Sequence, residues 1–289
     1  MTNLIIGAGS YLGTSFFNYL LQEGEPVYGI TESEPFNEKI YKSSYEVQQL
    51  QEIINETRPV NIYDFKTYKV SSNKLHFTSS LDEMIQPTSR IIKSLESTSS
   101  TIKNIYLLST VLLNENKNST HPYLKLKYLQ ENLYKKLANK NYFNYSCFRI
   151  PNVLGKNDMN FSRLVPYIMA NYIVKKPILL NSKKDVSREY VLIENLNKNL
   201  KNGNIENLET ICLSNEDLVA YIDLSLEKLD LESTNISWGN NKSVDEFISK
   251  TQSKNNINKD IFEKRIYEII KDYIYKSDLV SKKYLDTII

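Results

Sequence analysis

Three tyrosines in the chain are followed four residues later by a lysine: Tyr123 with Lys127, Tyr172 with Lys176, and Tyr267 with Lys271. In a helix this spacing places both side chains on one face. A tyrosine hydroxyl held in this way can transfer a proton to or from a substrate oxygen, and a neighbouring ammonium lowers the pKa of that hydroxyl. Because the chain contains 21 tyrosines and many lysines, such pairs also arise from composition alone. The surroundings of each pair must therefore decide which one is functional.

Only the pair at Tyr123 and Lys127 begins a predicted helix that follows a strand-like run ending in hydroxyl residues. That run, residues 105–108, leads directly into Ser109 and Thr110. A hydroxyl at this place could polarise a carbonyl that the tyrosine protonates. We predict that Thr110, Tyr123 and Lys127 form the catalytic group and that Ser109 hydrogen-bonds to the backbone. The two other pairs are interpreted as parts of a core and of a solvated helix face.

A glycine-rich turn connects the first apolar run of the chain to the first amphipathic segment. The turn follows residues 4–6 and reads Gly7-Ala8-Gly9-Ser10-Tyr11-Leu12-Gly13. Small residues here permit a tight turn, a close approach of the backbone to a pyrophosphate, and close packing of helix on strand. The helix N-terminus adds N–H groups and a partial positive charge. We therefore predict that residues 7 and 9–13 bind the phosphates of a dinucleotide.

The turn resembles that of the extended short-chain dehydrogenase/reductase family, in particular its NAD-dependent epimerase/dehydratase type, whose motif is G-x-x-G-x-x-G. Gly7 and Gly13 match the outer positions, whereas Ser10 stands at the middle one and Gly9 is displaced by one residue. The resemblance extends from the N-terminus to about residue 200. It implies a Rossmann fold that binds NAD or NADP, and a cofactor whose phosphates lie on the backbone of this turn.

The same resemblance assigns further residues to the cofactor site. Thr31 stands after the second strand-like run, where family members select between NAD and NADP, and its neutral hydroxyl leaves that choice open. The next residue, Glu32, favours NAD slightly but is equally compatible with a solvated carboxylate. Phe65 and Lys66 follow the third such run, where the family carries a small apolar pair beside the cofactor, so Lys66 is a departure. Lys127 would hold the nicotinamide ribose in addition to assisting the tyrosine.

Two later segments resemble the substrate-binding motifs of the family. Residues 149–155 match R-x-x-N-V-x-G, a loop whose backbone, around Pro151, meets the nicotinamide and whose Asn152 contacts the substrate. Arg149 is expected to be structural, bonding carbonyls or a carboxylate. Residues 187–191 match R-D-Y/F-V, and Arg188 would clamp the diphosphate of a nucleotide-linked sugar, which suits a planar and permanently charged group. Reductases of steroids and simple alcohols lack both segments.

The resemblance implies hydride transfer at a sugar carbon, with C4 as the first choice. Thr110 is followed by Val111 and Leu112 instead of the acidic pair of 4,6-dehydratases, and the interval from residue 110 to residue 123 is compact. This spacing resembles that of sugar-nucleotide 4-ketoreductases. The first hypothesis is therefore an NAD(P)-dependent reduction of a nucleotide-linked 4-keto-6-deoxysugar. A 4-epimerase that retains NAD, and a non-catalytic Rossmann protein that senses a dinucleotide, are the alternatives.

Composition argues against several other classes of function. The 36 Lys and Arg residues nearly balance the 34 Asp and Glu residues, which favours neither nucleic-acid nor anionic-membrane binding. No run approaches the roughly 20 apolar residues of a membrane span, and Met1 leads directly into a strand-like segment with no room for a signal peptide. Cys147 and Cys212 lie in apolar strand-like runs and are expected to be buried thiols in a reducing cytoplasm. No metal site is predicted.

The segments that must position these residues alternate between strand-like and helix-like patterns. Strand-like runs at 4–6, 27–30, 60–63, 105–108 and 145–150 alternate with helix-like ones at 12–21, 45–54, 81–95 and 123–138. This alternation predicts an α/β fold with a doubly wound parallel Rossmann sheet and ligands at the carboxyl ends of its strands.

Beyond Pro151 the alternation loosens. We predict a dinucleotide-binding domain over residues 1–150 and a smaller substrate-binding lobe over residues 151–289, with some segments returning to the Rossmann sheet. Helices are expected at 161–174, 194–201, 217–226, 243–250 and 259–275, and strands at 178–180 and 209–213. By resemblance, a homodimer would form through the helices at 81–95 and 123–138.

Overall fold

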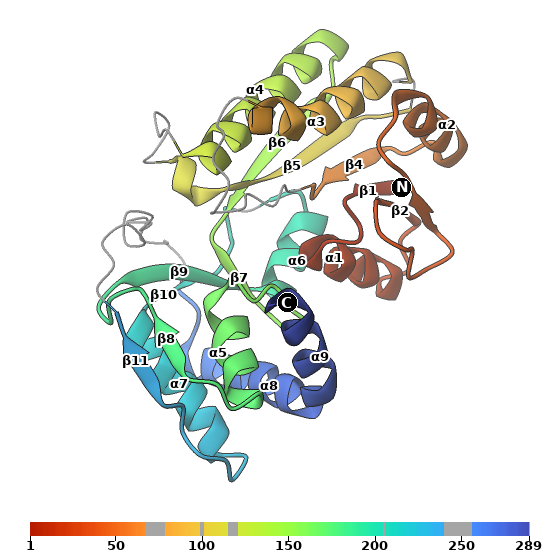
Figure 1. The fold of residues 1–289 in the computed structure, drawn as a ribbon. Coiled ribbons are helices and arrows are strands. Elements are labelled where there is room, and N and C mark those ends of the chain that lie inside the picture. The colour runs from red at the N-terminus through yellow and green to blue at the C-terminus, as the bar shows by residue number, and fades with distance from the viewer. Residues whose placement is uncertain (67–78, 99–100, 115–120, 205, 240–255, 289) are drawn as a thin grey trace. The chain divides into compact units, whose positions relative to one another are not determined.

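The computed structural model (Figure 1) describes residues 1–66, 79–98, 101–114, 121–204, 206–239 and 256–288. The chain forms two compact units. The first comprises Met1–Ile150 together with Leu200–Gly203, and the second comprises Pro151–Asn199 and Asn204–Ile289.

The first unit is a parallel sheet flanked by helices. Its elements are β1 (Asn3–Ile6), α1 (Tyr11–Gln22), β2 (Val27–Thr31), β3 (Ile40–Lys42), α2 (Val47–Thr57), β4 (Asn61–Asp64), α3 (Ser79–Ser97), β5 (Asn104–Thr110), the 3₁₀ helix η1 (Val111–Leu113), α4 (Pro122–Asn141) and β6 (Asn144–Ile150). The six strands run parallel in the order β3-β2-β1-β4-β5-β6. Figure 1 shows α2, α3 and α4 on one side of this sheet and α1 on the other. The predicted doubly wound α/β fold is confirmed.

Local sequence explains where these elements begin and end. Leu4 and Ile5 of β1 are fully buried, as expected for a central strand covered on both faces. α1 ends before Gly24, whose φ of +72° is left-handed, and α4 begins with Pro122 in its first turn. The edge strand β3 was not predicted from the sequence, because only Ile40 of its three residues is buried and no apolar run marks it.

A row of asparagines crosses the amino ends of four neighbouring strands. The side-chain amides donate in sequence from Asn144 to Asn104 (3.0 Å), from Asn104 to Asn61 (2.8 Å) and from Asn61 to Asn3 (2.9 Å). Each of these asparagines is paired in register with the next across β6, β5, β4 and β1. We call this row the asparagine ladder. It connects the amino ends of four strands, whereas the glycine turn lies at the carboxyl end of β1.

In its described residues the second unit combines two small sheets with helices around one apolar core. Its elements are β7 (Asn152–Leu154), α5 (Leu164–Ile173), β8 (Ile178–Leu180), β9 (Ser187–Leu192), α6 (Ile193–Lys201, whose end groups with the first unit), β10 (Ile211–Ser214), α7 (Asn215–Glu227), β11 (Ile236–Trp238), α8 (Lys259–Tyr275) and α9 (Ser277–Ile288). The sheet orders are β10-β9-β7 and β11-β8, and the core draws on α5, α7, α8 and α9. The helix expected at 243–250 lies outside the described residues. Every described helix is too short or too polar to cross a membrane.

The two cysteines differ in exposure, and one prediction about them is wrong. Both are free; Cys147 on β6 is half-buried, whereas Cys212 on β10 is exposed. The alternation along β10 explains this, because Ile211 and Leu213 point into the core and Cys212 points away from it.

Candidate active site

The glycine turn lies at the carboxyl end of β1 and is held against the neighbouring strands. The amides of Gly7 and Ala8 both donate to the carbonyl of Ile30 in β2, at 3.0 and 2.9 Å. Gly7 has a φ of +79°, and a Cβ at this position would lie 2.9 Å from the backbone nitrogen of Lys66. At Gly13 a Cβ would overlap the carbonyl oxygen of Gly7. Both glycines are therefore required for the turn to close and for α1 to pack on it.

The N-terminus of α1 follows this turn directly. Ser10 is the N-cap residue, and its Oγ accepts from the amide of Gly13 at 3.1 Å. The amides of a first helical turn lack partners within the helix and, with the helix dipole, attract an anion. The turn and the start of α1, with Gly9, Tyr11 and Leu12 at their junction, fit the pyrophosphate of a dinucleotide.

The end of β2 presents hydroxyl groups next to the turn. Thr31 is buried, and its Oγ1 lies 2.9 Å from Oγ of Ser33. A Cβ at Gly9 would overlap both hydroxyls, so the turn touches the strand end at this glycine. The position that the family uses to select the cofactor is therefore neutral and locally hydrogen-bonded.

Lys66 follows β4, and its side chain extends past the carboxyl end of β1 to the end of β2. Its Nζ lies 2.5 Å from Oε2 of Glu32 and 4.3 Å from the ring centroid of Tyr45. The Lys66 side chain is only 9% exposed, whereas that of Glu32 is 56% exposed. Glu32 is thus solvent-exposed, as one interpretation of the sequence has it, and in addition forms an ion pair with a nearly buried ammonium. Phe65, which precedes Lys66, is buried, and its ring lies 5.5 Å from that of Phe16 on α1.

The two hydroxyl residues at the end of β5 have different partners. Thr110 is the N-cap of η1, and its Oγ1 accepts weakly from the amide of Leu112 at 3.3 Å. The Ser109 hydroxyl donates to Oε1 of Glu131 on α4 at 2.5 Å. The predicted hydrogen bond from Ser109 to the backbone is therefore wrong, because its hydroxyl binds a carboxylate and thereby connects β5 to α4.

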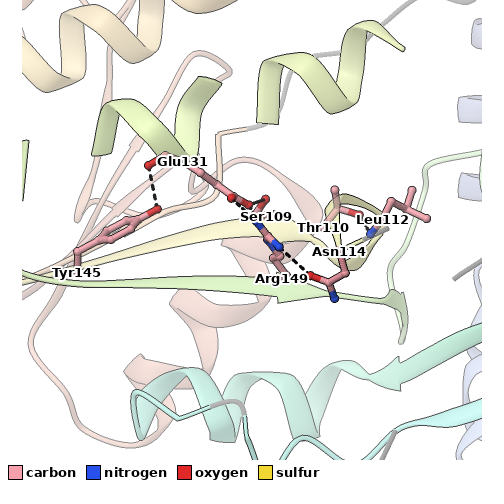
Figure 2. A network of polar contacts seen from close by, with 7 residues as sticks. All are labelled: Ser109, Thr110, Leu112, Asn114, Glu131, Tyr145 and Arg149. Carbon is pink, nitrogen blue, oxygen red and sulfur yellow. Dashed lines mark hydrogen bonds and ion pairs between the residues drawn. The ribbon is translucent and has the colours of Figure 1, made fainter. Parts of the chain in front are cut away.

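Figure 2 shows the network that contains Ser109. Arg149 on β6 donates twice to Glu131, from Nε at 3.0 Å and from Nη2 at 2.7 Å, and its Nη1 donates to Asn114 at 2.8 Å. The pKa of Glu131 is lowered because these hydrogen bonds and the charge of Arg149 outweigh the opposing effect of burial. The structural role predicted for Arg149 agrees with this geometry: it fixes α4 against the ends of β5 and β6.

Lys127 projects from α4 into the interior at the end of β5. Its Nζ donates to the carbonyl of Leu108 at 2.9 Å and to Oε1 of Gln130 at 3.1 Å, and the residue is 2% exposed. An ammonium has three hydrogens to donate, and within the described residues these two bonds use two of them. Burial lowers the pKa of Lys127. The remaining N–H suits a hydroxyl of a ribose at this strand end.

Asp64 is the charged partner of Lys127, and sequence reasoning missed it. It ends β4 fully buried, where its Oδ2 accepts from Tyr134 at 2.7 Å and from Gln130 at 3.2 Å. Its Oδ1 accepts from the amide of Lys66 at 2.7 Å. Burial raises the pKa of Asp64, while the Tyr134 hydrogen bond and the Lys127 charge oppose that rise. Gln130 therefore links a buried carboxylate to a buried ammonium.

Tyr123 lies in the first turn of α4, one helical turn before Lys127. Lys127 and Thr110 thus lie at the same end of β5. Tyr123 belongs to α4, the helix from which Lys127 extends to that end. The other two Tyr/Lys pairs have no such surroundings. The hydroxyl of Tyr172 donates to the carbonyl of Glu232, and the Tyr267 ring lies beneath the ammonium of its own partner at 5.9 Å.

The second unit holds the two residues assigned to the substrate. Asn152 of β7 is exposed and donates to the carbonyl of Glu189 at 3.2 Å, directly after the buried Pro151. Arg188 of β9 donates from Nη1 to Oδ1 of Asn215 at 2.7 Å and from Nη2 to Oγ of Ser182 at 3.5 Å. Both acceptors are neutral, and in the described part of the chain Arg188 forms no ion pair. Its charge is therefore oriented without being neutralised.

Solved structures with the same fold come from nucleotide-sugar enzymes. The UDP-glucose 4-epimerase of Thermotoga maritima, solved with UDP-glucose, superposes with a TM-score of 0.74 at 14% identity, covering 96% of this chain and 99% of that one. The UDP-glucose 4-epimerase of Thermus thermophilus in complex with NAD gives 0.71 at 12% identity (94% and 99%). The dTDP-glucose 4,6-dehydratase of Bacillus anthracis in complex with NAD gives 0.72 at 16% identity (96% and 98%). At these identities the likeness establishes a common fold.

Sequence comparison places the chain in a family. No curated protein matches it at the sequence level. The model of the NAD dependent epimerase/dehydratase family, however, matches residues 3–198, which is more than half of the chain. The match includes the glycine turn, the end of β5, α4 and Arg188. The protein therefore belongs to the NAD dependent epimerase/dehydratase family and is an enzyme of the extended short-chain dehydrogenase/reductase type.

Proposed function

We propose that the protein transfers a hydride at C4 of a nucleotide-linked sugar and that it reduces a 4-keto-6-deoxysugar. The observation that carries this proposal is the reach of Lys127 from α4 to the carbonyl of Leu108, two residues before Thr110. This contact joins the helix that carries Tyr123 to the strand end that carries Thr110. The elements that carry the proton donor Tyr123, the ammonium of Lys127 and the hydroxyl of Thr110 then meet at the carboxyl end of β5. A Rossmann fold binds its ligands at the carboxyl ends of its strands.

The three side chains would divide the work of reduction. When bound, the nicotinamide supplies the hydride to C4. Tyr123 donates its hydroxyl proton to the C4 oxygen, and Thr110 polarises the same oxygen before transfer. Lys127 favours the tyrosinate that results and holds the ribose through its third N–H. The keto group becomes an alcohol, and Tyr123 regains a proton from water.

Arg188 supports the assignment of the substrate class. A diphosphate carries delocalised negative charge that a planar guanidinium binds through two hydrogen bonds. The Asn215 and Ser182 oxygens orient Arg188 without cancelling its charge, which leaves the cation available to an anionic ligand. A sugar linked to a nucleotide diphosphate has such an anion, whereas a simple alcohol does not.

The residues after Thr110 favour reduction over dehydration. Elimination of water from a sugar needs groups that remove one proton and donate another. In this chain η1 supplies Val111, Leu112 and Leu113, and Leu113 is fully buried. None of these side chains can exchange a proton. Hydride transfer with a single proton donor is what this segment supports.

A 4-epimerase is the second candidate. It would use the same three residues but reverse the hydride transfer after the sugar turns over, so the cofactor would stay bound. The family description and the fold shared with two UDP-glucose 4-epimerases favour it. The third hypothesis, a dinucleotide sensor without catalysis, does not agree with the assignment of the chain to an enzyme family.

Replacing Tyr123 by Phe tests the catalytic assignment. We expect turnover of 4-keto nucleotide sugars to fall by roughly a hundredfold or more, because a positioned general acid contributes about that much. Binding of NADH, followed by nicotinamide fluorescence, should be retained. Tyr267→Phe is the matched control, since it changes the tyrosine of another Tyr/Lys pair. Equal activity of both variants would contradict the assignment, because it would show that turnover does not depend on the Tyr123 hydroxyl.

Denaturing the purified protein and measuring the released nucleotide separates the two enzymes. A reductase must exchange its cofactor at each turnover, so we expect less than one equivalent of dinucleotide to be released and steady consumption of added NADH or NADPH. Stoichiometric NAD, together with interconversion of two C4 epimers without added cofactor, would instead identify a 4-epimerase.

A further inference from the structure

We propose that Asn215 is the positioning residue of Arg188: its amide oxygen orients the guanidinium for the diphosphate of the sugar nucleotide and leaves the positive charge uncompensated. The inference rests on the proposed function, because it concerns how the second unit would bind that substrate. Asn215 lies 27 residues after Arg188, at the start of α7 and beyond residues 3–198 that match the family model. It acts through Arg188 and needs no contact of its own with the substrate.

The hydrogen bonds of the Asn215 amide permit one orientation. Its Nδ2 donates to the carbonyl of Lys183 at 2.7 Å and to Oγ of Ser182 at 2.9 Å. A backbone carbonyl only accepts hydrogen bonds, so exchanging the amide nitrogen and oxygen would bring two acceptors together. The oxygen therefore faces Arg188, whose Nη1 donates to it at 2.7 Å. At 1% exposure, Asn215 is shielded from water that would compete for these bonds.

The helix start that carries Asn215 is itself held in place. The backbone amides of Asn215 and Glu216 donate to two carbonyls of the segment between β8 and β9, at 3.0 and 3.1 Å. Ser214 and Asp217 form a capping box at the same helix start. This segment leads into β9, the strand that carries Arg188. The amide oxygen is therefore fixed relative to the strand whose guanidinium it contacts.

The described hydrogen-bond partners of Arg188 are neutral. Besides Asn215 they are Ser182, whose Oγ lies 3.5 Å from Nη2, and Tyr190, two residues along β9. Burial raises the pKa of Tyr190 to about 12, and Arg188 opposes that rise, so this phenol stays protonated at neutral pH. A guanidinium has five N–H groups, and these contacts leave donors for a further acceptor. An amide thus supplies the direction of a hydrogen bond without an opposite charge, and the cation keeps its attraction for a diphosphate.

Calorimetric titration of the full-length protein with UDP and, separately, with dTDP tests the inference, and two substitutions separate orientation from charge. Asn215→Leu, of similar size, removes the oxygen that holds Arg188. We expect it to weaken nucleoside-diphosphate binding by roughly tenfold, the size of one hydrogen bond to a charged group. Asn215→Asp brings a carboxylate to the guanidinium and should weaken binding further. In turnover both variants should raise KM and change kcat much less, because the diphosphate is not the reacting group.

Asp217→Asn is the matched control for a purely structural role. It breaks the capping box at the same helix start, whose described hydrogen bonds do not include Arg188. Thermal unfolding measures the stability that each variant loses, and the control should lose stability but keep its affinity for UDP and dTDP. An equal loss of affinity in the control would overturn the inference. So would a further loss on adding Asn215→Leu to Arg188→Met, because the amide acts only through the guanidinium.

Replacing Arg188 itself tests the orientation independently of how well the variants at position 215 fold. Arg188→Lys keeps the charge but lacks the planar fork that Asn215 holds, so it should bind UDP and dTDP nearly as weakly as Arg188→Met. Wild-type affinity in Arg188→Lys would overturn the inference. If Arg188→Met weakens binding but Asn215→Leu does not, this inference alone fails. If Arg188→Met has no effect, or wild type binds neither nucleotide, the proposed nucleotide-linked substrate fails as well.

Discussion

At the scale of single residues, the feature that most affects the chemistry is the buried link from Asp64 through Gln130 to Lys127. Burial lowers the pKa of Lys127, and the charge of Asp64 raises it. Asp64→Asn should therefore lower the pKa of Lys127 further, because the ammonium loses the carboxylate that favours its protonated form. If activity requires the protonated lysine, the alkaline limb of the kcat/KM profile should move to lower pH by about one unit. A pH profile of the variant checks this.

Tyr134→Phe provides the control for that experiment. It removes one hydrogen bond to Asp64 at 2.7 Å but leaves the carboxylate charge in place, so its alkaline limb should move less. A variant that loses activity equally at all pH values would indicate that Asp64 only supports folding. An unchanged alkaline limb in Asp64→Asn would contradict the link to Lys127.

At the scale of elements, the asparagine ladder connects four strands that helices separate in the sequence. Asn61 occupies an interior position, donating to Asn3 and accepting from Asn104, whereas Asn144 ends the ladder with one bond. We expect Asn61→Ala to lower the free energy of unfolding by about 2 kcal/mol, because it removes two bonds and leaves partners unsatisfied. Asn144→Ala, at the exposed end, should cost about 1 kcal/mol or less. Urea unfolding of both variants measures the difference, and equal values would mean that the ladder does not act as a unit.

At the scale of the whole molecule, α4 bears a hydrophobic surface that a second copy could cover. Tyr128 and Leu129 are adjacent on this helix and are 41% and 43% exposed. Apolar side chains at the centre of an interface lose affinity when replaced by charge, so Tyr128→Lys with Leu129→Lys should convert the expected homodimer to a monomer. Light scattering after gel filtration measures the mass. Leu285→Lys on α9, at 42% exposure, is the matched control.

This prediction depends on a homodimer that only family resemblance implies. A monomeric wild type would contradict it at once. A dimer that survives the double substitution would place the interface elsewhere. In either case the site in the first unit stays as described, because Lys127, Asp64 and the glycine turn all lie within Met1–Ile150.

The sequence by itself determined the fold class, the order of the elements in the first half and the glycine turn. These features depend on local signals: the apolar runs of β1 and β2, the alternation with helices, and small residues where a strand meets a helix. Context along the chain was also enough to prefer Tyr123 over Tyr172 and Tyr267. Of the three-residue strands, β8 was predicted, whereas β3, β7 and β11 were missed because so short a run carries little periodicity. The strand β9 and the C-terminal helix α9 were not predicted either.

Only the tertiary structure decided which charges meet. Lys66 and Glu32 come from strands on either side of β1, and Gln130 and Asp64 are 66 residues apart. The partners of Ser109 and Arg188 are 22 and 27 residues away. Strand order brings such side chains together, and composition cannot reveal whether a lysine is solvated, paired or buried. The departure at Lys66 was visible in the sequence, but its partner, and hence its meaning, came from the arrangement of the sheet.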